Sequence, residues 1–107
     1  MSEEQWKEAA VQAGYDVHAL AKLCFVSTRQ LQRDFHHLFQ TTPGEWLARK
    51  RIEAAQRLLL SGLSVKAVAL ELGFKHTSHF CRQFKTFVSQ TPTEYITAQR
   101  LAVVVCR

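Results

Sequence analysis

Residues 69–85, with the sequence ALELGFKHTSHFCRQFK, decide the fold that we expect for this chain. Phe80 and Phe84 lie after Gly73 and are four residues apart, which puts both rings on one face of a helix. Gly73 separates this helix from an apolar segment before it, and glycine readily adopts the positive φ of a tight turn. The stretch therefore predicts a short helix, a tight turn and a longer helix with a buried aromatic stripe.

The same pattern occurs earlier in the chain. Leu31–Phe35 aligns with Phe80–Phe84, and Thr42–Trp46 aligns with Thr91–Tyr95 at the same separation. The short apolar segments before them are separated by one residue less than the longer helices are. We therefore expect the second turn to be one residue longer. Two such copies predict a pair of helix-turn-helix units. The alternative is two generic helical hairpins whose agreement is accidental.

Capping residues divide the sequence into about seven helices, and no strand-like alternation persists, so we expect an all-α fold. Ser27 starts a helix that runs to about Phe39, and Thr42-Pro43-Gly44-Glu45 starts a long one that runs to about Ser61. The remaining expected helices start at Ser2, Asp16, Ser64, Ser78 and Thr91, and the one from Ser78 runs to Phe87. Within one domain, we assign residues 1–41 to the first helix-turn-helix unit, 42–61 to a connecting helix, 62–100 to the second unit and 101–107 to an apolar tail of unassigned structure.

Composition limits the classes of partner. The chain has 107 residues, a formal net charge of +5 and a pI near 9.5. A basic small domain suits a polyanion, because neutralising phosphates releases counterions. Its start is polar and acidic and no apolar run could span a bilayer, so we expect a cytoplasmic protein without membrane contact. Cys24, Cys81 and Cys106 form no Cys-x-x-Cys pair, which gives no sign of a disulfide framework.

Each longer helix has one apolar and one polar face. At about 100° per residue from Leu31, Phe35, Leu38 and Thr28 form the buried stripe of the first copy. The opposite face of this helix carries Arg29, Arg33, His36 and His37, with Gln32 at its edge. In the second copy Phe80, Phe84 and Phe87 point inward, whereas Ser78, Arg82 and Lys85 point outward and His79 and Cys81 flank them.

Arg33 and Arg82 occupy equivalent positions on the second helix of each unit. In a helix-turn-helix protein that helix lies in the major groove, where arginine can form a fork of hydrogen bonds with guanine. The alternative is a solvated face without a partner, which the recurrence in both copies disfavours. Trp46 and Tyr95 are also equivalent, and we expect each to pack its helix against its own unit.

Further basic side chains suit phosphate contacts, which fix register without carrying sequence information. They are Arg49, Lys50 and Arg51 on the connecting helix, and Lys75 and Lys85 beside the second reading helix. The alternative is that these residues are ordinary soluble surface.

These residues together resemble the DNA-binding domain of the AraC/XylS family of bacterial transcription regulators over about residues 17–100. The resemblance is carried by the segment quoted above, by Thr91-Pro92 with Tyr95, by Leu31, Arg33 and Phe35, and by Arg51-Ile52-Glu53-Ala54-Ala55 with Leu58-Leu59. It implies two recognition helices in successive major grooves of duplex DNA. By position, the implied base contacts are Arg29, Gln32 and Arg33 in the first unit and Thr77, Ser78, His79 and Arg82 in the second. It also implies RNA polymerase as a partner of any activator, and often a separate sensor or dimerisation domain, which is not visible in this sequence.

Three positions depart from the family pattern, which often has glycine there. Phe25 stands in the first turn, and Gln40 and Ser89 stand at the exits of the two reading helices. Because phenylalanine tolerates positive φ poorly, the departure predicts a rebuilt first turn or a less regular first unit.

Other functions fit the sequence less well. His76, His79 and Cys81 are close in sequence, but zinc needs four converging ligands and no fourth is evident, so we expect no metal. No phosphate-binding loop, nucleophile elbow or cofactor motif occurs, which argues against an enzyme. A helical protein-interaction module that uses the apolar segment from Leu101 to Val105 is the remaining alternative.

Overall fold

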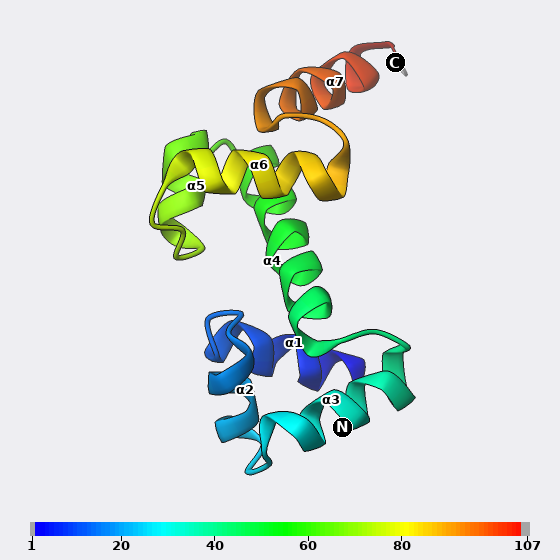
Figure 1. Ribbon diagram of the computed structural model, residues 1–107. Coiled ribbons are helices and arrows are strands. Elements are labelled where there is room, and N and C mark those ends of the chain that lie inside the picture. The colour runs from blue at the N-terminus through cyan, green and yellow to red at the C-terminus, as the bar shows by residue number, and fades with distance from the viewer. Residues whose placement is uncertain (1, 106–107) are drawn as a thin grey trace. The chain divides into compact units, whose positions relative to one another are not determined.

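The protein, described here by a computed structural model, folds entirely into helices over the described residues, 2–105 (Figure 1). This confirms the all-α prediction. In chain order the helices are α1 (Glu3–Gln12), α2 (Val17–Leu23), α3 (Thr28–Phe39), α4 (Pro43–Leu60), α5 (Val65–Glu71), α6 (Thr77–Val88) and α7 (Pro92–Val105).

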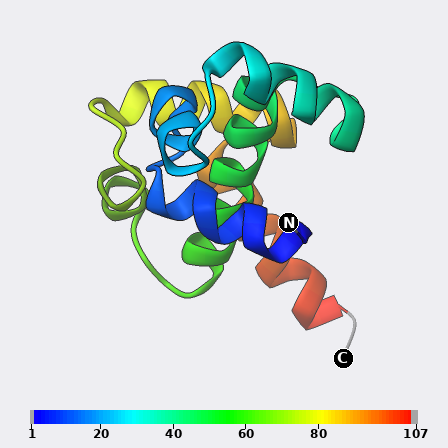
Figure 2. The same ribbon diagram turned by 90° about the horizontal axis from the view of Figure 1, so that it is seen from below.

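The chain forms two compact units that divide within α4, between Arg51 and Ile52. In unit 1, α2 contacts both α1 and α3. In unit 2, α6 contacts both α5 and α7. Each pair of contacting helices can be followed in two views (Figures 1 and 2). The turn between α2 and α3 contains residues 24–27, and the turn between α5 and α6 contains residues 72–76, so the second turn is one residue longer, as predicted.

Side-chain caps explain where the helices start. In α1 the Ser2 hydroxyl accepts from the Gln5 backbone N–H, and the Gln5 side chain accepts from the Ser2 N–H. Such caps typically contribute about 1 kcal/mol each. Helix α6 differs, because its N-cap residue His76 makes no side-chain capping bond and the helix starts at Thr77, one residue before the predicted start. The other caps are Asp16, Ser27, Thr42, Ser64 and Thr91.

The core of unit 1 is built around Phe35. Its ring packs edge-on against Trp6 at 4.9 Å and against Trp46 at 5.2 Å between centroids. Because Trp6 lies on α1 and Trp46 on α4, these contacts fix α3 against both helices. Aromatic pairs of this geometry contribute about 0.5–1.5 kcal/mol beyond the burial of their surface.

Unit 2 repeats this arrangement with different rings. Phe84 packs against Phe80 at 5.8 Å and against Tyr95 at 5.5 Å, and Phe80 packs against Phe74 at 5.2 Å. The pair Phe84–Tyr95 is equivalent to the pair Phe35–Trp46 in unit 1. Trp46 and Tyr95 therefore have the packing role that their equivalent sequence positions predicted.

One predicted core residue is wrong. Leu38 was expected in the buried stripe of α3, but its side chain is 53% exposed. Phe39 takes that place, because its ring stacks on Trp46 at 5.3 Å and meets Trp6 edge-on at 6.5 Å. In α6 the residue equivalent to Leu38 is Phe87, which is half-buried.

The apolar segment that begins at Leu101 continues α7, which extends to Val105. A separate tail therefore does not begin at residue 101. Residues 106 and 107 of the predicted tail lie outside the described residues. None of the described helices combines the length and the hydropathy needed to cross a bilayer.

The turn at Phe25 has the same local structure as the turn at Gly73. Phe25 adopts φ 57° and Gly73 adopts φ 79°. Each turn closes with a backbone bond to the preceding helix, from the Val26 N–H to the Ala21 carbonyl at 3.0 Å and from the Phe74 N–H to the Ala69 carbonyl at 2.9 Å. The predicted rebuilding of the first turn is therefore wrong. Gln40 and Ser89 also adopt left-handed backbone, at φ 53° and 67°.

Phe25 combines this strained backbone with a side chain that is 96% exposed. A left-handed conformation costs a non-glycine residue about 1–2 kcal/mol, and a glycine at this position avoids that cost. Glycine is also freer in the unfolded chain, which reduces the gain in stability by roughly 0.5–1 kcal/mol. We therefore expect Phe25→Gly to increase the free energy of unfolding by about 0.5–1 kcal/mol, measured by urea denaturation followed by circular dichroism. The equivalent change Gly73→Ala should lower it by a similar amount. A less stable Phe25→Gly variant would show that the exposed ring makes a stabilising contact.

Candidate nucleic-acid interface

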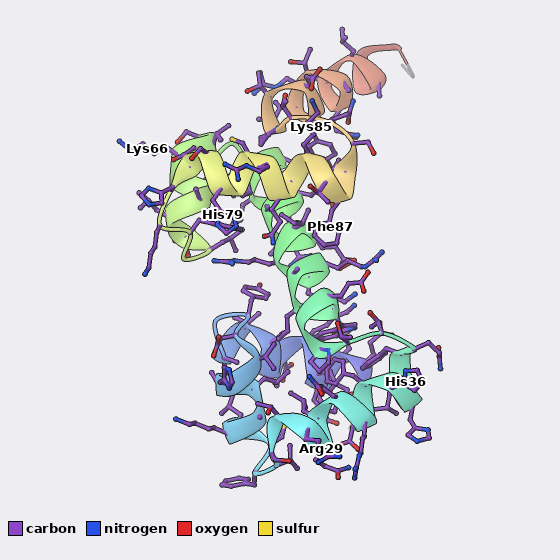
Figure 3. All side chains as sticks on the ribbon, in the orientation of Figure 1. Arg29, His36, Lys66, His79, Lys85 and Phe87 are labelled. Atoms are coloured by element: carbon purple, nitrogen blue, oxygen red, sulfur yellow. The ribbon has the colours of Figure 1, made fainter. Side chains whose placement is uncertain are left out.

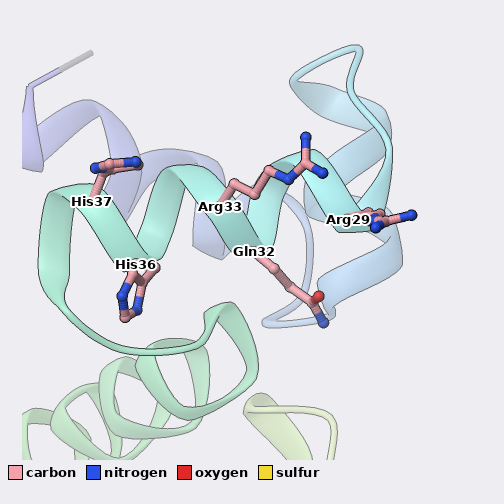
Figure 4. Close-up of a pocket in the computed structure, with 5 residues that line it drawn as sticks. All are labelled: Arg29, Gln32, Arg33, His36 and His37. Carbon is pink, nitrogen blue, oxygen red and sulfur yellow. The ribbon is translucent and has the colours of Figure 1, made fainter.

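One face of α3 carries five exposed polar side chains. Helical spacings of three and four residues bring them to the side of the helix opposite Leu31 and Phe35, which are fully buried. Figure 4 shows the five side chains projecting outward from α3, where they line one shallow surface concavity. They are Arg29, Gln32, Arg33, His36 and His37.

The two arginines of this face are available to a partner. Neither Arg29 nor Arg33 forms an ion pair with any residue between 2 and 105. The acidic residue of α3 is Asp34, and its carboxylate accepts a 2.9 Å hydrogen bond from the Gln30 side chain. Both guanidinium groups therefore keep donors free for base edges or phosphates.

The exposed polar face of α6 begins at the first residue of the helix, Thr77. Thr77, Ser78, Arg82 and Lys85 are all exposed, and Arg82 has no ion-pair partner in the described part of the chain. His79 is exposed as well, but its ring lies edge-on to the buried Phe74 at 5.5 Å. Figure 3 shows His79 near the start of α6 and Lys85 toward its end.

The basic cluster predicted on α4 is largely engaged by the protein itself. Arg49 pairs with Glu45 at 3.7 Å, and the Lys50 ammonium lies over the Trp46 ring at 5.4 Å from its centroid. Arg51 is half-buried, and this burial lowers the pKa of its guanidinium while Tyr15 partly opposes the shift. Arg49 and Lys50 therefore already have partners on α4 itself, and Arg51 is partly buried.

Lys75 and Lys85 are exposed and lie next to or within α6. Lys85 has an acidic neighbour, Glu94. Hydrogen bonding to Thr91 holds the pKa of the Glu94 carboxyl below its usual range, and the positive charge of Lys85 adds to this effect. The charge of Lys85 on α6 therefore interacts with the carboxylate of Glu94 on α7.

The cysteines and histidines do not gather into a metal site. Within residues 2–105 no three His, Cys, Asp or Glu side chains lie close enough together to hold an ion, and this includes His76, His79 and Cys81. Burial raises the pKa of the Cys24 thiol, and Asp34 adds to this shift. Cys24 therefore remains a neutral thiol packed against the core of unit 1.

The concavity on α3 contains two residues to which the sequence analysis gave no contact. His36 and His37 share it with the three predicted base-contacting residues. Their helical positions had already placed them on the same face, but the resemblance supplied roles only for Arg29, Gln32 and Arg33.

Comparison with known proteins identifies the fold and the family. A family model described as a helix-turn-helix domain matches residues 20–98. The solved DNA-binding domain of the global transcriptional factor AdpA, in complex with a target DNA, is 31% identical, covers 88% of this chain and 87% of its own, and superposes with a TM-score of 0.77. A transcriptional regulator from Chromobacterium violaceum, described as containing an AraC-type DNA-binding domain, is 26% identical, covers 88% of this chain and 92% of its own, and superposes with a TM-score of 0.71.

Curated relatives give the same result at the level of sequence. An uncharacterised helix-turn-helix regulator of Haemophilus influenzae is 34% identical over 85 residues, which are 78% of this chain and 28% of that protein. The regulator GlxA of Rhizobium meliloti is 37% identical over 86 residues, which are 79% of this chain and 26% of GlxA. The chain thus spans about a quarter of the length of these relatives. The matched model, the two repeated units and the exposed arginine faces agree, and the chain belongs to the family of AraC-type helix-turn-helix domains, which bind DNA in transcription regulators.

Proposed function

We propose that this chain binds duplex DNA with sequence specificity, and that α3 and α6 are its two recognition helices. The observation that carries the proposal is the equivalence of Arg33 and Arg82. Both lie on the exposed face of the second helix of a unit, and neither is paired with a carboxylate of the described chain. The relative AdpA, whose domain was solved on a target DNA, supports the same partner.

Base contacts from unit 1 come from Arg29, Gln32 and Arg33. The arginine fork fits the O6 and N7 acceptors of guanine, and the glutamine amide can donate to and accept from adenine. The backbone of α3 is fixed by the rings around Phe35, so these side chains extend from a rigid helix. Rigid presentation reduces the entropy lost on binding.

Base contacts from unit 2 come from Thr77, Ser78, His79 and Arg82. Three of these residues lie in the first turn of α6, the part of a recognition helix that enters the groove first. His79 has less freedom than the others because its ring rests on Phe74.

Phosphate contacts come mainly from Lys75 and Lys85. We assign a smaller part to Arg49, Lys50 and Arg51. Arg49 is paired with Glu45, Lys50 lies over the Trp46 ring, and Arg51 is half-buried. Where the whole protein is an activator, RNA polymerase is its expected partner. A DNA partner of this kind places the protein with the nucleoid in the bacterial cytoplasm.

Selection of bound sequences from random duplex DNA, at two salt concentrations, tests the proposal directly. We expect one sequence to be enriched. A footprint of the protein on that duplex should show two protected segments about 10 base pairs apart, since recognition helices of one protein enter grooves about one helical turn apart. Affinity should fall steeply with salt. Recovery of unenriched sequences, or binding that is insensitive to salt, would contradict the proposal and favour a protein-interaction module.

Arg33→Ala and Arg82→Ala test the two recognition faces. Each should lower affinity for the selected duplex by ~1–3 kcal/mol and relax the preference at nearby base pairs, because a bidentate base contact is lost. Competition binding with single-base variants of the duplex measures both effects. Arg57→Ala removes an exposed arginine of α4 and is the matched control, which should bind like the parent. Unchanged affinity in either test variant would show that its helix does not contact bases.

Lys85→Ala tests a phosphate contact. We expect it to weaken binding to selected and random duplexes by the same factor and to reduce the slope of log affinity against log salt by about 1. Lys7→Ala removes an equal charge from α1, where Lys7 pairs with Glu4 at 3.5 Å, and should leave the slope unchanged. A Lys85→Ala variant that lost preference for the selected sequence would place this residue at a base.

A further inference from the structure

We propose that His36 and His37 extend the α3 interface to the phosphates beside the groove and couple DNA binding to proton uptake, an inference that rests on the proposed function. Both imidazoles are exposed and line the same concavity as Arg29, Gln32 and Arg33 (Figure 4). Histidine is the side chain whose charge ordinarily changes between about pH 5 and pH 8. The interface would therefore gain positive charge as the pH falls.

The spacing along α3 fits such a role. His36 lies seven residues after Arg29, on the same stripe of the helix and about 10 Å further along its axis at 1.5 Å per residue. The major groove is about 12 Å wide. When Arg29 and Arg33 meet base edges inside the groove, the next turn of the same face lies at its rim, where the phosphates are.

The internal repeat provides independent support. His36 directly follows Phe35, and Lys85 directly follows the equivalent Phe84. Unit 2 therefore places a permanent cation where unit 1 places a titratable one. If Lys85 neutralises a phosphate beside its groove, His36 is positioned to neutralise one beside the groove of unit 1 whenever it is protonated.

The charges around α3 set the sign of the coupling. No acidic side chain of residues 2–105 forms an ion pair with His36 or His37, and Asp34 on the same helix is bonded to Gln30. Arg29 and Arg33 share their face and repel a further positive charge, whereas DNA phosphates attract one. We therefore expect the added positive charge to strengthen binding to the phosphates as the pH falls. On the elements packed against α3, the charged and titratable groups of unit 1 are Glu3, Glu4, Lys7 and Glu8 on α1, Tyr15 in the turn after it, Asp16, His18, Lys22 and Cys24 at α2, and Glu45, Arg49, Lys50 and Arg51 on α4.

A structural role for the histidines makes a different prediction. His36 and His37 lie in the last turn of α3, where a positive charge interacts favourably with the helix dipole. In that case acidification would change the stability of the free protein and leave DNA affinity unchanged. Measuring the free energy of unfolding without DNA, at both pH values, separates this role from the proposed one.

The test measures affinity for a fluorescently labelled duplex obtained by the selection above, at about pH 6 and about pH 8 and constant salt. We expect the parent to bind several-fold more tightly at the lower pH, because each protonated imidazole can neutralise one phosphate. When the measurement is repeated over a range of salt concentrations, the slope of log affinity against log salt should be steeper at the lower pH by up to about 2, one counterion for each added phosphate contact.

Four proteins are compared. The double variant His36→Gln with His37→Gln should lose most of the gain in affinity that the parent shows between about pH 8 and about pH 6. His36→Lys should already bind more tightly at about pH 8, because it gives unit 1 the cation that unit 2 has. His18→Gln removes an exposed histidine of α2 and should behave like the parent.

Equal pH dependence in the parent and in the double variant would overturn the inference while leaving the proposed function intact. The same holds if the double variant loses stability but not the pH dependence of affinity. A parent that binds no selected duplex at either pH overturns the proposed function, and this inference with it.

Discussion

The orientation of each proposed recognition helix depends on the aromatic contacts of one buried phenylalanine. Phe35 on Trp46 and Phe84 on Tyr95 join the inner face of the helix to the first turns of the helix that follows it. A fully buried ring allows the helix little rotation about its axis, since turning it would open a cavity in the core. Because Arg33 and Arg82 lie two residues before these rings, about 160° away around the helix, burying the rings exposes the guanidinium groups.

The sequence predicts most of the local structure because that structure is set by short-range chemistry. Ser27, Ser64 and Thr91 cap the helices that follow them through bonds spanning three residues, and such bonds can be anticipated from the residue types alone. The order of helices follows from these signals, and the longer second turn follows from the alignment of the two sequence copies. The start of α6 was predicted one residue late, because no side chain caps this helix.

The choice between Leu38 and Phe39 could not be predicted from spacing along α3. Leu38 lies closer in angle to Leu31, so periodicity favours it as the buried residue. The outcome is decided by Trp6 and Trp46, whose rings come from other helices and contact Phe39.

The same limit applies to the basic residues of α4. Their number can be read from the sequence, but their engagement by Glu45 and Trp46 is a property of the folded chain. The roles of individual residues toward DNA remain predictions.

The two units share a backbone frame that tolerates substitution at its turns. Phe25 occupies a position where Gly73 stands in the other copy, and the backbone bonds that close both turns are nearly the same in length. The frame therefore overrides the preference of a single residue, at a cost of about 1–2 kcal/mol. The units differ in their core rings and also in the side chains on their exposed faces. Unit 1 offers two arginines with two histidines, whereas unit 2 offers one arginine with a lysine beside Glu94. A duplicated scaffold thus presents two unequal charged faces, and we expect the two units to contribute differently to the binding of one duplex.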